Sequence, residues 1–445
     1  MGKETKLRSD LWQIAQTALK AVAPEACLHR AIRREGKHLR VGKQTFDLSQ
    51  VRRIIVVGMG KASARMAAAL EEVLADRTVD GLVVTADGYR VPTRNVEVLE
   101  ATHPVPDERG LAAAQRIAAL IDGAEAENLV IVLISGGGSA LLPFPAQGLT
   151  LSDLTRTNEL LLRSGARIQE MNAVRKHLSQ VKGGQLAKRA FPARVLSLFL
   201  SDVPGDPLDA IASGPTVPDP TTFKDAERIL RRYQLWEEVP ATVRKRIEAG
   251  VQGGIPETPK PGDPAFRGVQ NVIMGSGAVA AEVARAEGER LGYHTLLLTT
   301  TLEGEAREIG KVFAALAREE ISCRRPLEPP ALILAAGETT VTVRGNGKGG
   351  RNQELALSAA MGIEGLSRVV IASIGTDGRD GPTDAAGGIV DGETTGRMRD
   401  RGIVPEEYLE QNDSYRALEK AGDLLITGPT GTNVADLYLI AVGKG

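Results

Sequence analysis

The sequence predicts an α/β protein built from two α/β domains, and three observations support this prediction. Short runs of aliphatic and β-branched residues are apolar throughout, which is typical of strands buried on both faces of a parallel sheet. Helical patterns separate these runs, and strand–helix alternation indicates a parallel sheet with helices on both faces. The chain has 445 residues, whereas a single hydrophobic core stops growing at about 250–300 residues.

The first domain is predicted over residues 1–248. Its clearest strand patterns lie at residues 53–60, 81–88, 128–138 and 193–202. Helix-like stretches such as "SARMAAALEEVLADR" follow them. The first 40 residues are interpreted as a helix and a polar connector that pack onto this domain.

The second domain is predicted over residues 249–445. Residues 249–267 are rich in Pro and Gly and have no apolar period, which is typical of a loop or domain boundary. Further strand patterns follow it, among them "NVIMGSG", "YHTLLLTTT", "ALILAAG" and "RVVIASIG".

Composition excludes several classes of protein. The net charge is −1 and aromatic residues make up 3%, so the chain has neither the basic field nor the stacking platforms of a nucleic-acid binder. No apolar run reaches the roughly 18 residues of a membrane helix. Two cysteines cannot form a disulfide framework, and the N-terminus has no apolar signal-peptide core. We therefore expect a cytoplasmic protein without membrane or nucleic-acid partners; a homodimer is compatible with the sequence.

Two glycine-rich turns follow predicted strands, where open α/β sheets bind ligands. In "GMGKAS", Gly58, Gly60 and Ser63 surround Lys61, whose mobile charge suits phosphate oxygens. The pattern differs from the dinucleotide G-x-G-x-x-G because Ser63 replaces the third glycine. A plain βα turn with a surface lysine is the structural alternative.

The second turn, "ISGGGSALLPFP", contains Gly136, Gly137 and Gly138 followed by Ser139. Three successive glycines allow close approach of backbone N–H groups, so we expect a phosphate or carboxylate site. It is neither a P-loop nor a nucleophile elbow, because neither spacing occurs there.

Cationic residues gather in two further stretches. In "MNAVRKHLSQVKGGQLA", Arg175 and Lys182 are seven residues apart and share a face if the stretch is helical; a solvated helix surface is the equal alternative. In "GNGKGGRNQELAL", Arg351 would begin a helix, where a cation is unfavourable unless an anion accompanies it. That local conflict is typical of a functional site.

Acidic residues follow two predicted strands. Asp202 comes directly after the run at 193–202, where a carboxylate can accept a substrate proton. Asp377 follows "VVIASIG" and is the expected Mg²⁺ ligand, because Mg²⁺ takes one or two carboxylates plus phosphates. We interpret the neighbouring Asp209, Asp380 and Asp391 as turn formers. Weaker candidates are His103, Asn433 and Asp436.

Together these stretches resemble the MOFRL-type glycerate kinase family. The matching segments run from about residue 54 to the end and are "VVGMGKAS", "THPVPDERG", "LISGGGSALLPFP", "MNAVRKHLSQVKGGQLA", "SDVPGDPLDAIASGPTVPD", "GGRNQELAL", "GTDGRDGPTDAAGG" and "TGPTGTNVADLYL". Eight ordered motifs are far more specific than one glycine loop.

The resemblance implies an ATP-dependent kinase that phosphorylates glycerate, typically at the 2-hydroxyl to give 2-phosphoglycerate. It implies an N-terminal Rossmann-like domain, a C-terminal domain with the MOFRL region at about 330–442, and an active site in the cleft between them. Lys61 and Arg351 match the family's proposed catalytic residues. We expect Ala at either position to lower kcat by orders of magnitude with folding retained.

Two alternatives remain at this point. One is an NAD(P)H-dependent hydroxypyruvate reductase, a label that some family members have carried. Against it stand Lys61, Ser63 and the lack of a clear acidic residue for the ribose at the end of the second strand. The other is a non-enzymatic nucleotide- or carbohydrate-sensing module, which would need fewer polar glycine loops than this chain has. Which loop takes ATP and which takes glycerate stays open.

Overall fold

The computed structural model describes residues 3–444 and divides the chain into two compact units. Unit 1 comprises Met1–Ala26, Asp202–Gly205 and Gly275–Gly445. Unit 2 comprises Cys27–Ser201 and Asp206–Met274. Within the described residues, no helix is long and apolar enough to cross a membrane.

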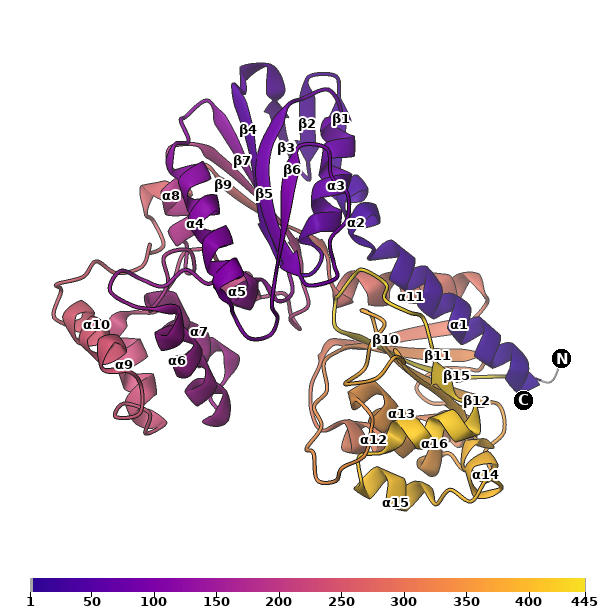
Figure 1. Ribbon diagram of the computed structural model, residues 1–445. Coiled ribbons are helices and arrows are strands. Elements are labelled where there is room, and N and C mark those ends of the chain that lie inside the picture. The colour runs from indigo at the N-terminus through magenta and orange to yellow at the C-terminus, as the bar shows by residue number, and fades with distance from the viewer. Residues whose placement is uncertain (1–2, 445) are drawn as a thin grey trace. The chain divides into compact units, whose positions relative to one another are not determined.

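Unit 2 is built on a six-stranded sheet with the order β6-β5-β4-β7-β8-β9 (Figure 1). Neighbours from β6 to β8 pair in parallel. Numbered in chain order, the strands lie in the order 3-2-1-4-5-6, which is the Rossmann-like arrangement. Successive strands are added to one side of β4 and then, from β7 onward, to its other side. The strands are β4 Arg53–Met59, β5 Val79–Ala86, β6 Val96–Ala101, β7 Asn128–Ser135, β8 Arg194–Leu200 and β9 Val269–Gly275.

Helices cover both faces of this sheet, as the apolar strands require. The helix α3 (Ser63–Leu74) packs on one face, and α4 (Glu108–Asp122) packs with α8 (Gln185–Ala190) on the other (Figure 1). Every residue of β7 is buried. The predicted parallel α/β domain is therefore confirmed.

The chain between strands adds a separate helical layer to unit 2. Its apolar core includes Leu161, Val174, Phe223 and Trp236. The amphipathic patterns of these helices bury one face of each against the others. The helices are α6 Leu151–Arg163, α7 Ile168–His177, α9 Phe223–Arg232 and α10 Ala241–Val251, and the short α5 Gly138–Leu141 precedes them.

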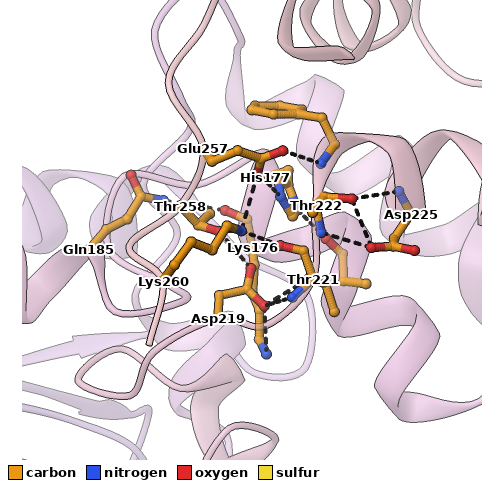
Figure 2. Close-up of polar contacts among 12 residues, drawn as sticks. Lys176, His177, Gln185, Asp219, Thr221, Thr222, Asp225, Glu257, Thr258 and Lys260 are labelled. Carbon is orange, nitrogen blue, oxygen red and sulfur yellow. Dashed lines mark hydrogen bonds and ion pairs between the residues drawn. The ribbon is translucent and has the colours of Figure 1, made fainter. Parts of the chain in front are cut away.

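The boundary between the units in this part of the chain lies between Met274 and Gly275, and not at the predicted position between residues 248 and 249. Residues 249–267 belong to unit 2, because polar contacts tie them to α7 and to residues 219–223 (Figure 2). Glu257 accepts a hydrogen bond from the Phe223 N–H and pairs with His177, and Asp219 donates its N–H to the Pro259 carbonyl. The next strand, β9, then adds to the sheet of unit 2 beside β8.

Unit 1 contains a mixed six-stranded sheet with the order β10-β11-β15-β12-β13-β14. The strand β15 runs antiparallel to both of its neighbours, so β11 and β12 point the same way on either side of it. The strands are β10 His294–Leu302, β11 Ala331–Gly337, β12 Val369–Gly375, β13 Gly387–Asp391, β14 Leu424–Leu425 and β15 Asp436–Val442.

Helices cover both faces of this sheet as well. The helices α1 (Lys3–Ala21) and α11 (Gly277–Arg290) lie together on one face, and α12 (Ala306–Cys323) and α13 (Arg351–Gly362) lie on the other (Figure 1). Three short helices pack outside α13. They are α14 Thr394–Arg399, α15 Pro405–Glu410 and α16 Ser414–Ala421.

The N-terminal helix exists as predicted, but the prediction that it packs on the first domain is wrong. The helix α1 belongs to unit 1, where Arg8 pairs with the buried carboxylates of Asp391 and Asp423 and Tyr293 donates to Asp10. The boundary between the units falls inside α2 (Pro24–Ala31), and the rest of the connector belongs to unit 2 as an antiparallel meander. Its strands are β1 Ile32–Glu35, β2 His38–Val41 and β3 Gln44–Asp47.

Candidate functional site

The two glycine turns of unit 2 lie side by side at the carboxyl ends of β4 and β7. These strands pair in parallel and flank the point where the strand order reverses, which is where open α/β sheets bind ligands. Gly60 has φ +120°, and a Cβ on it would overlap Ser135. The turn therefore needs glycine for its backbone geometry and for close packing against β7.

The backbone N–H groups of the first turn are already bonded inside the protein. Gly60 donates to the Val84 carbonyl at 3.1 Å and Lys61 to the Gly136 carbonyl at 2.9 Å. Ala62 donates to Ser135 Oγ at 3.0 Å, and Ser63 donates to the Gly60 carbonyl at 3.0 Å. A dinucleotide pyrophosphate binds to open N–H groups at such a turn. This turn offers it none of these four.

Two residues expected in the ligand site instead support the sheet. Ser63 is fully buried, and its hydroxyl donates to the Val84 carbonyl at 2.9 Å. Gly58 lies inside β4, where a Cβ would stand 2.9 Å from both the Leu133 carbonyl oxygen and Val83 Cγ1. Both residues close the packing behind the turn, so the ligand role predicted for them has no support in this geometry.

Lys61 is the polar side chain that the first turn leaves available. It is half-buried, and its ammonium group has no hydrogen bond or ion pair with any residue in the range 3–444. The pKa of His103 is lowered to about 4, first by desolvation of its ring and second by the charge of Lys61. The ring of His103 lies against Gly137, where a Cβ would stand 2.9 Å from the ring.

A polar cluster in unit 2, which we call the Lys182 cluster, joins the second turn to α7. Lys182 Nζ donates to the carbonyl and to the hydroxyl of Ser139, each at 2.7 Å. Arg175 donates to the side-chain oxygens of Asn158 at 2.8 Å and Asn172 at 3.4 Å. Ser213 connects the two cations, because it donates to Asn172 and lies 3.2 Å from Ser139 Oγ.

Arg175 and Lys182 come together for a different reason from the predicted shared helix face. The helix α7 ends at His177, so Lys182 lies in the turn before α8. Ser179 Oγ accepts the N–H groups of residues 181 and 182, and two glycines with positive φ, Gly183 and Gly184, continue the turn. Gly184 is the N-cap of α8, so Lys182 lies in the turn that connects two helices.

In unit 1, the strand register gathers four acidic residues at one edge of the sheet. Asp436 begins β15 and is paired with Gly337 at the end of β11 and with Gly375 at the end of β12. Glu338 and Asp377 therefore follow those strands on either side of Asp436. Asp202 reaches the same edge, where it accepts a hydrogen bond from Asn433 Nδ2 at 3.3 Å.

Arg351 is held by two of these acids. Its guanidinium group makes a two-point ion pair with Asp436 and contacts Glu338 through Nη1 at 2.9 Å. Burial opposes the charge, but Asp436 and Glu338 raise the pKa of Arg351 above its usual value. The anion expected beside Arg351 at this helix N-terminus is therefore provided by the carboxylates of Asp436 and Glu338. Asp380 caps the same helix by accepting the N–H groups of Asn352 and Gln353.

The unit 1 site carries more acid than base. Burial raises the pKa of Glu338 to about 7; Arg351 opposes this shift, and Asp436, Asp202 and Asp377 add to it. Such an excess of carboxylate suits a cation. Among residues 3–444, however, no group of three or more His, Cys, Asp or Glu side chains is arranged to hold a metal by itself.

Sequence reasoning missed two residues of these sites. Glu338 follows an apolar strand directly, which is the same signal that selected Asp202 and Asp377, and it was available in "ALILAAGE". Ser213 sits in a loop with positive φ at 62° and has no local pattern that marks it. Asp436, treated as a weaker candidate, is the central acid of the unit 1 site.

Several polar residues of the remaining motifs have structural partners. Asp391 pairs with Arg8 and Arg397, and Asp384 accepts from the Tyr415 hydroxyl. Asn412 is buried and donates a hydrogen bond to Glu354. Lys348 lies over the Tyr415 ring at 3.9 Å.

Comparison with known families identifies two segments of the chain. Residues 10–248 match a family model described as a domain of unknown function, DUF4147, and residues 331–436 match the MOFRL family.

Relatives match nearly the whole chain. A glycerate 2-kinase of Pyrococcus horikoshii is 45% identical, with 96% of this chain and 95% of the relative covered. A D-glycerate 2-kinase of Thermotoga maritima is 46% identical over 90% of this chain and 93% of the relative. A relative from Agrobacterium vitis, provisionally named a hydroxypyruvate reductase, is 46% identical over 88% and 87%. The crystal structure of a glycerate kinase from Thermotoga maritima superposes with a TM-score of 0.88, at 42% identity, over 98% of this chain and 100% of that chain.

Proposed function

Because this chain belongs to the MOFRL-type glycerate kinase family, we propose that it transfers the terminal phosphoryl group of ATP to the 2-hydroxyl of D-glycerate. The products are ADP and 2-phosphoglycerate. The oxygen of the 2-hydroxyl forms the new P–O bond, the bond from phosphorus to the β,γ-bridging oxygen breaks, and the hydroxyl proton leaves to a base.

One observation separates this proposal from a reductase. The Gly60–Lys61 turn stands where a dinucleotide would bind, but its four N–H groups are bonded to protein acceptors. The same turn leaves the ammonium group of Lys61 without a partner among residues 3–444. A closed turn with an unpaired cation favours a transferring phosphoryl group over a pyrophosphate cradle.

Lys61 and Arg351 are the proposed catalytic residues. Phosphoryl transfer depends chiefly on positioning and on positive charge near the transferring oxygens, since the protein forms no covalent bond in the reaction. Lys61 supplies a mobile charge from unit 2. Arg351 supplies a guanidinium group from unit 1 whose plane Asp436 and Glu338 fix. We propose that both act on one reaction.

The acids of unit 1 fit a magnesium ion that arrives with the nucleotide. Mg²⁺ is usually bound by one or two carboxylates together with substrate phosphates. Asp377 uses Oδ1 to accept the Arg379 N–H at 2.9 Å, which leaves Oδ2 for a cation. We propose Asp377 as the ligand; the ion would neutralise phosphate charge, and ATP and Mg²⁺ are the expected cosubstrate and cofactor.

We propose Asp202 as the acceptor of the hydroxyl proton. Asn433 donates a hydrogen bond to one of its carboxylate oxygens. The residue lies two positions after the carboxyl end of β8, and ligands bind at such strand ends in open α/β sheets. Glu338 is a second carboxylate at the same edge of the unit 1 sheet. Glu338 already contacts Arg351 Nη1 at 2.9 Å, so we assign the proton to Asp202.

A direct assay distinguishes the kinase from the reductase. The wild-type protein is incubated with ATP, Mg²⁺ and D-glycerate, and ADP is measured by chromatography; hydroxypyruvate with NADH or NADPH is followed in parallel by absorbance. We expect glycerate-dependent ADP and no loss of reduced cofactor. Loss of NADH or NADPH without ADP formation would establish the reductase. Binding of ATP or glycerate with neither reaction would favour the sensing module.

Three expectations from the sequence stay predictions. They are a cytoplasmic location, the homodimer, and partners limited to small molecules.

A further inference from the structure

The Lys182 cluster contains two cations and no acid. Lys182 is 6% exposed, and its ammonium group donates hydrogen bonds to the carbonyl and hydroxyl oxygens of Ser139. Arg175 is bonded to the amide oxygens of Asn158 and Asn172. Each acceptor is neutral, and no carboxylate among residues 3–444 pairs with either cation.

Lys176, near the end of α7, is a second buried lysine of unit 2, and it is paired with acidic residues. It is 2% exposed, and its ammonium group lies 3.5 Å from the fully buried Asp219 (Figure 2). The same group lies 3.4 Å from Asp209. Thr258 and Thr221 hold the Asp219 carboxylate in place. Lys182 lies in the same region of unit 2 without any such counter-charge.

An unpaired buried cation carries a desolvation cost, which favours its neutral form. Burial and the neighbouring charge of Arg175 accordingly lower the pKa of Lys182 to about 7, and burial lowers the pKa of Arg175. An anion bound beside both side chains would remove this cost. The arrangement is that of a site completed by a ligand with negative charge.

The donors that remain fit a carboxylate. An ammonium group has three N–H donors and a guanidinium group five. Ser139 accepts two hydrogen bonds from the ammonium group of Lys182, and the two asparagines accept two from the guanidinium group of Arg175. The remaining planar fork of Arg175 matches a planar carboxylate. Surrounding hydroxyl and amide groups, from Ser213 and Asn172, suit the hydroxyls of a small hydroxy acid.

We propose that the Lys182 cluster binds the carboxylate of D-glycerate and so selects hydroxy acids over neutral polyols. This inference rests on the proposed kinase function and adds the substrate subsite to it. Lys61, at the neighbouring turn, then serves the phosphoryl group. On this proposal the turn with Ser139 contacts glycerate, and the turn with Lys61 contacts the phosphoryl group of ATP.

The test compares D-glycerate with D-glyceramide, which replaces the carboxylate by a neutral amide of the same shape. For the wild type, we expect kcat/KM to favour glycerate by about 10²–10³-fold, the equivalent of about 3–4 kcal/mol for an unmatched buried charge. In Lys182→Met we expect this preference to fall at least tenfold, with KM for ATP within threefold. Lys188→Met, an exposed lysine on α8, is the matched control.

Equilibrium dialysis with radiolabelled D-glycerate in the absence of ATP adds a readout that does not need turnover. We expect binding by the wild type and Lys188→Met and at least tenfold weaker binding by Lys182→Met and Arg175→Met. An unchanged glycerate preference in a folded Lys182→Met, or a rise in KM for ATP alone, would overturn the subsite while leaving the kinase intact. Glycerate binding that depends on Lys182 in a protein without kinase activity would keep the subsite and reject the kinase.

Discussion

Arg351 and Asp436 form a two-point ion pair in which Nε lies 2.5 Å from Oδ2 and Nη2 lies 3.0 Å from Oδ1. Asp436 is fully buried, whereas about a third of the Arg351 side chain is exposed. The pair therefore fixes one face of the guanidinium group to the sheet and leaves part of it open. This relationship gives Arg351, which we propose as a catalytic residue, a structural role that the sequence did not predict.

Removal of Arg351 alone should consequently destabilise unit 1. Arg351→Met leaves a buried carboxylate unpaired, which costs about 2–4 kcal/mol, below the range for a fully buried pair because Arg351 is partly exposed. The double variant Arg351→Met/Asp436→Asn removes both charges and should recover most of that loss in chemical denaturation. Both variants should lose about 10³-fold or more in kcat. Recovery of activity in the double variant would show that Arg351 acts only through stability.

Replacement of Lys61 should separate catalysis from stability. Lys61 is half-buried and has no protein partner among residues 3–444, so Lys61→Met should change the free energy of unfolding by less than about 0.5 kcal/mol. We expect kcat to fall by about 10²–10³-fold, as for the loss of one group that stabilises transition-state charge. Steady-state kinetics and urea denaturation of the same preparation test this, and turnover near the wild-type value would remove Lys61 from the mechanism.

Asp202 has a matched control in its own loop. Asp202→Asn should lower kcat by about 10²–10⁴-fold, the range for loss of a general base. Asp206→Asn makes the same change of charge four residues later, at φ +54°, a conformation that Asn and Asp both tolerate. It should leave kcat unchanged. Equal losses in the two variants would mean that the loop, and not the Asp202 carboxylate, supports the reaction.

The pKa of Lys182, about 7 in the fold against 10.5 when unperturbed, gives stability a pH dependence of defined sign. Between these pH values the unfolded chain binds a proton that the folded protein does not. The free energy of unfolding contributed by this group therefore rises from pH 7 to pH 10.5 and is lowest below pH 7.

Denaturant titrations of the wild type and Lys182→Met at pH 7 and pH 9 measure this contribution. The wild type should gain more stability than the variant over that interval. Saturating glycerate should flatten the difference, since a bound carboxylate keeps Lys182 protonated. An identical pH dependence in the two proteins would place the lysine pKa near its ordinary value.

The sequence predicted the strand pattern of unit 2 well because parallel strands buried on both faces are apolar throughout. The turn at Gly60 and the turn at Gly137 were both found, since glycine is required there by positive φ and close packing. Which donors remain open was not predictable. The sequence does not tell whether Ser63 and Gly58 face a ligand or the sheet. In the structure they face the sheet, because Ser63 donates to the Val84 carbonyl and Gly58 packs against the Leu133 carbonyl.

The domain organisation was less predictable for a similar reason. Residues 249–267 have the composition of a linker, yet Glu257 and Thr258 bind side chains of unit 2 that are far away in the sequence. The α1 pattern shows an amphipathic helix but not the surface that it covers. The proximity of Glu338 and Asp436 also depends on long-range pairing, because the register of β15 with β11 brings them together.

The measurement that tests the central claim most directly is a proton-coupled ³¹P NMR spectrum of the product formed from ATP, Mg²⁺ and D-glycerate. The phosphorus of 2-phosphoglycerate couples to the single proton on C2 and gives a doublet, whereas that of 3-phosphoglycerate couples to two protons and gives a triplet. We predict a new phosphomonoester doublet that is absent without glycerate and strongly reduced in Lys61→Met. A triplet would contradict transfer to the 2-hydroxyl, and a spectrum with no new phosphomonoester would contradict the kinase itself.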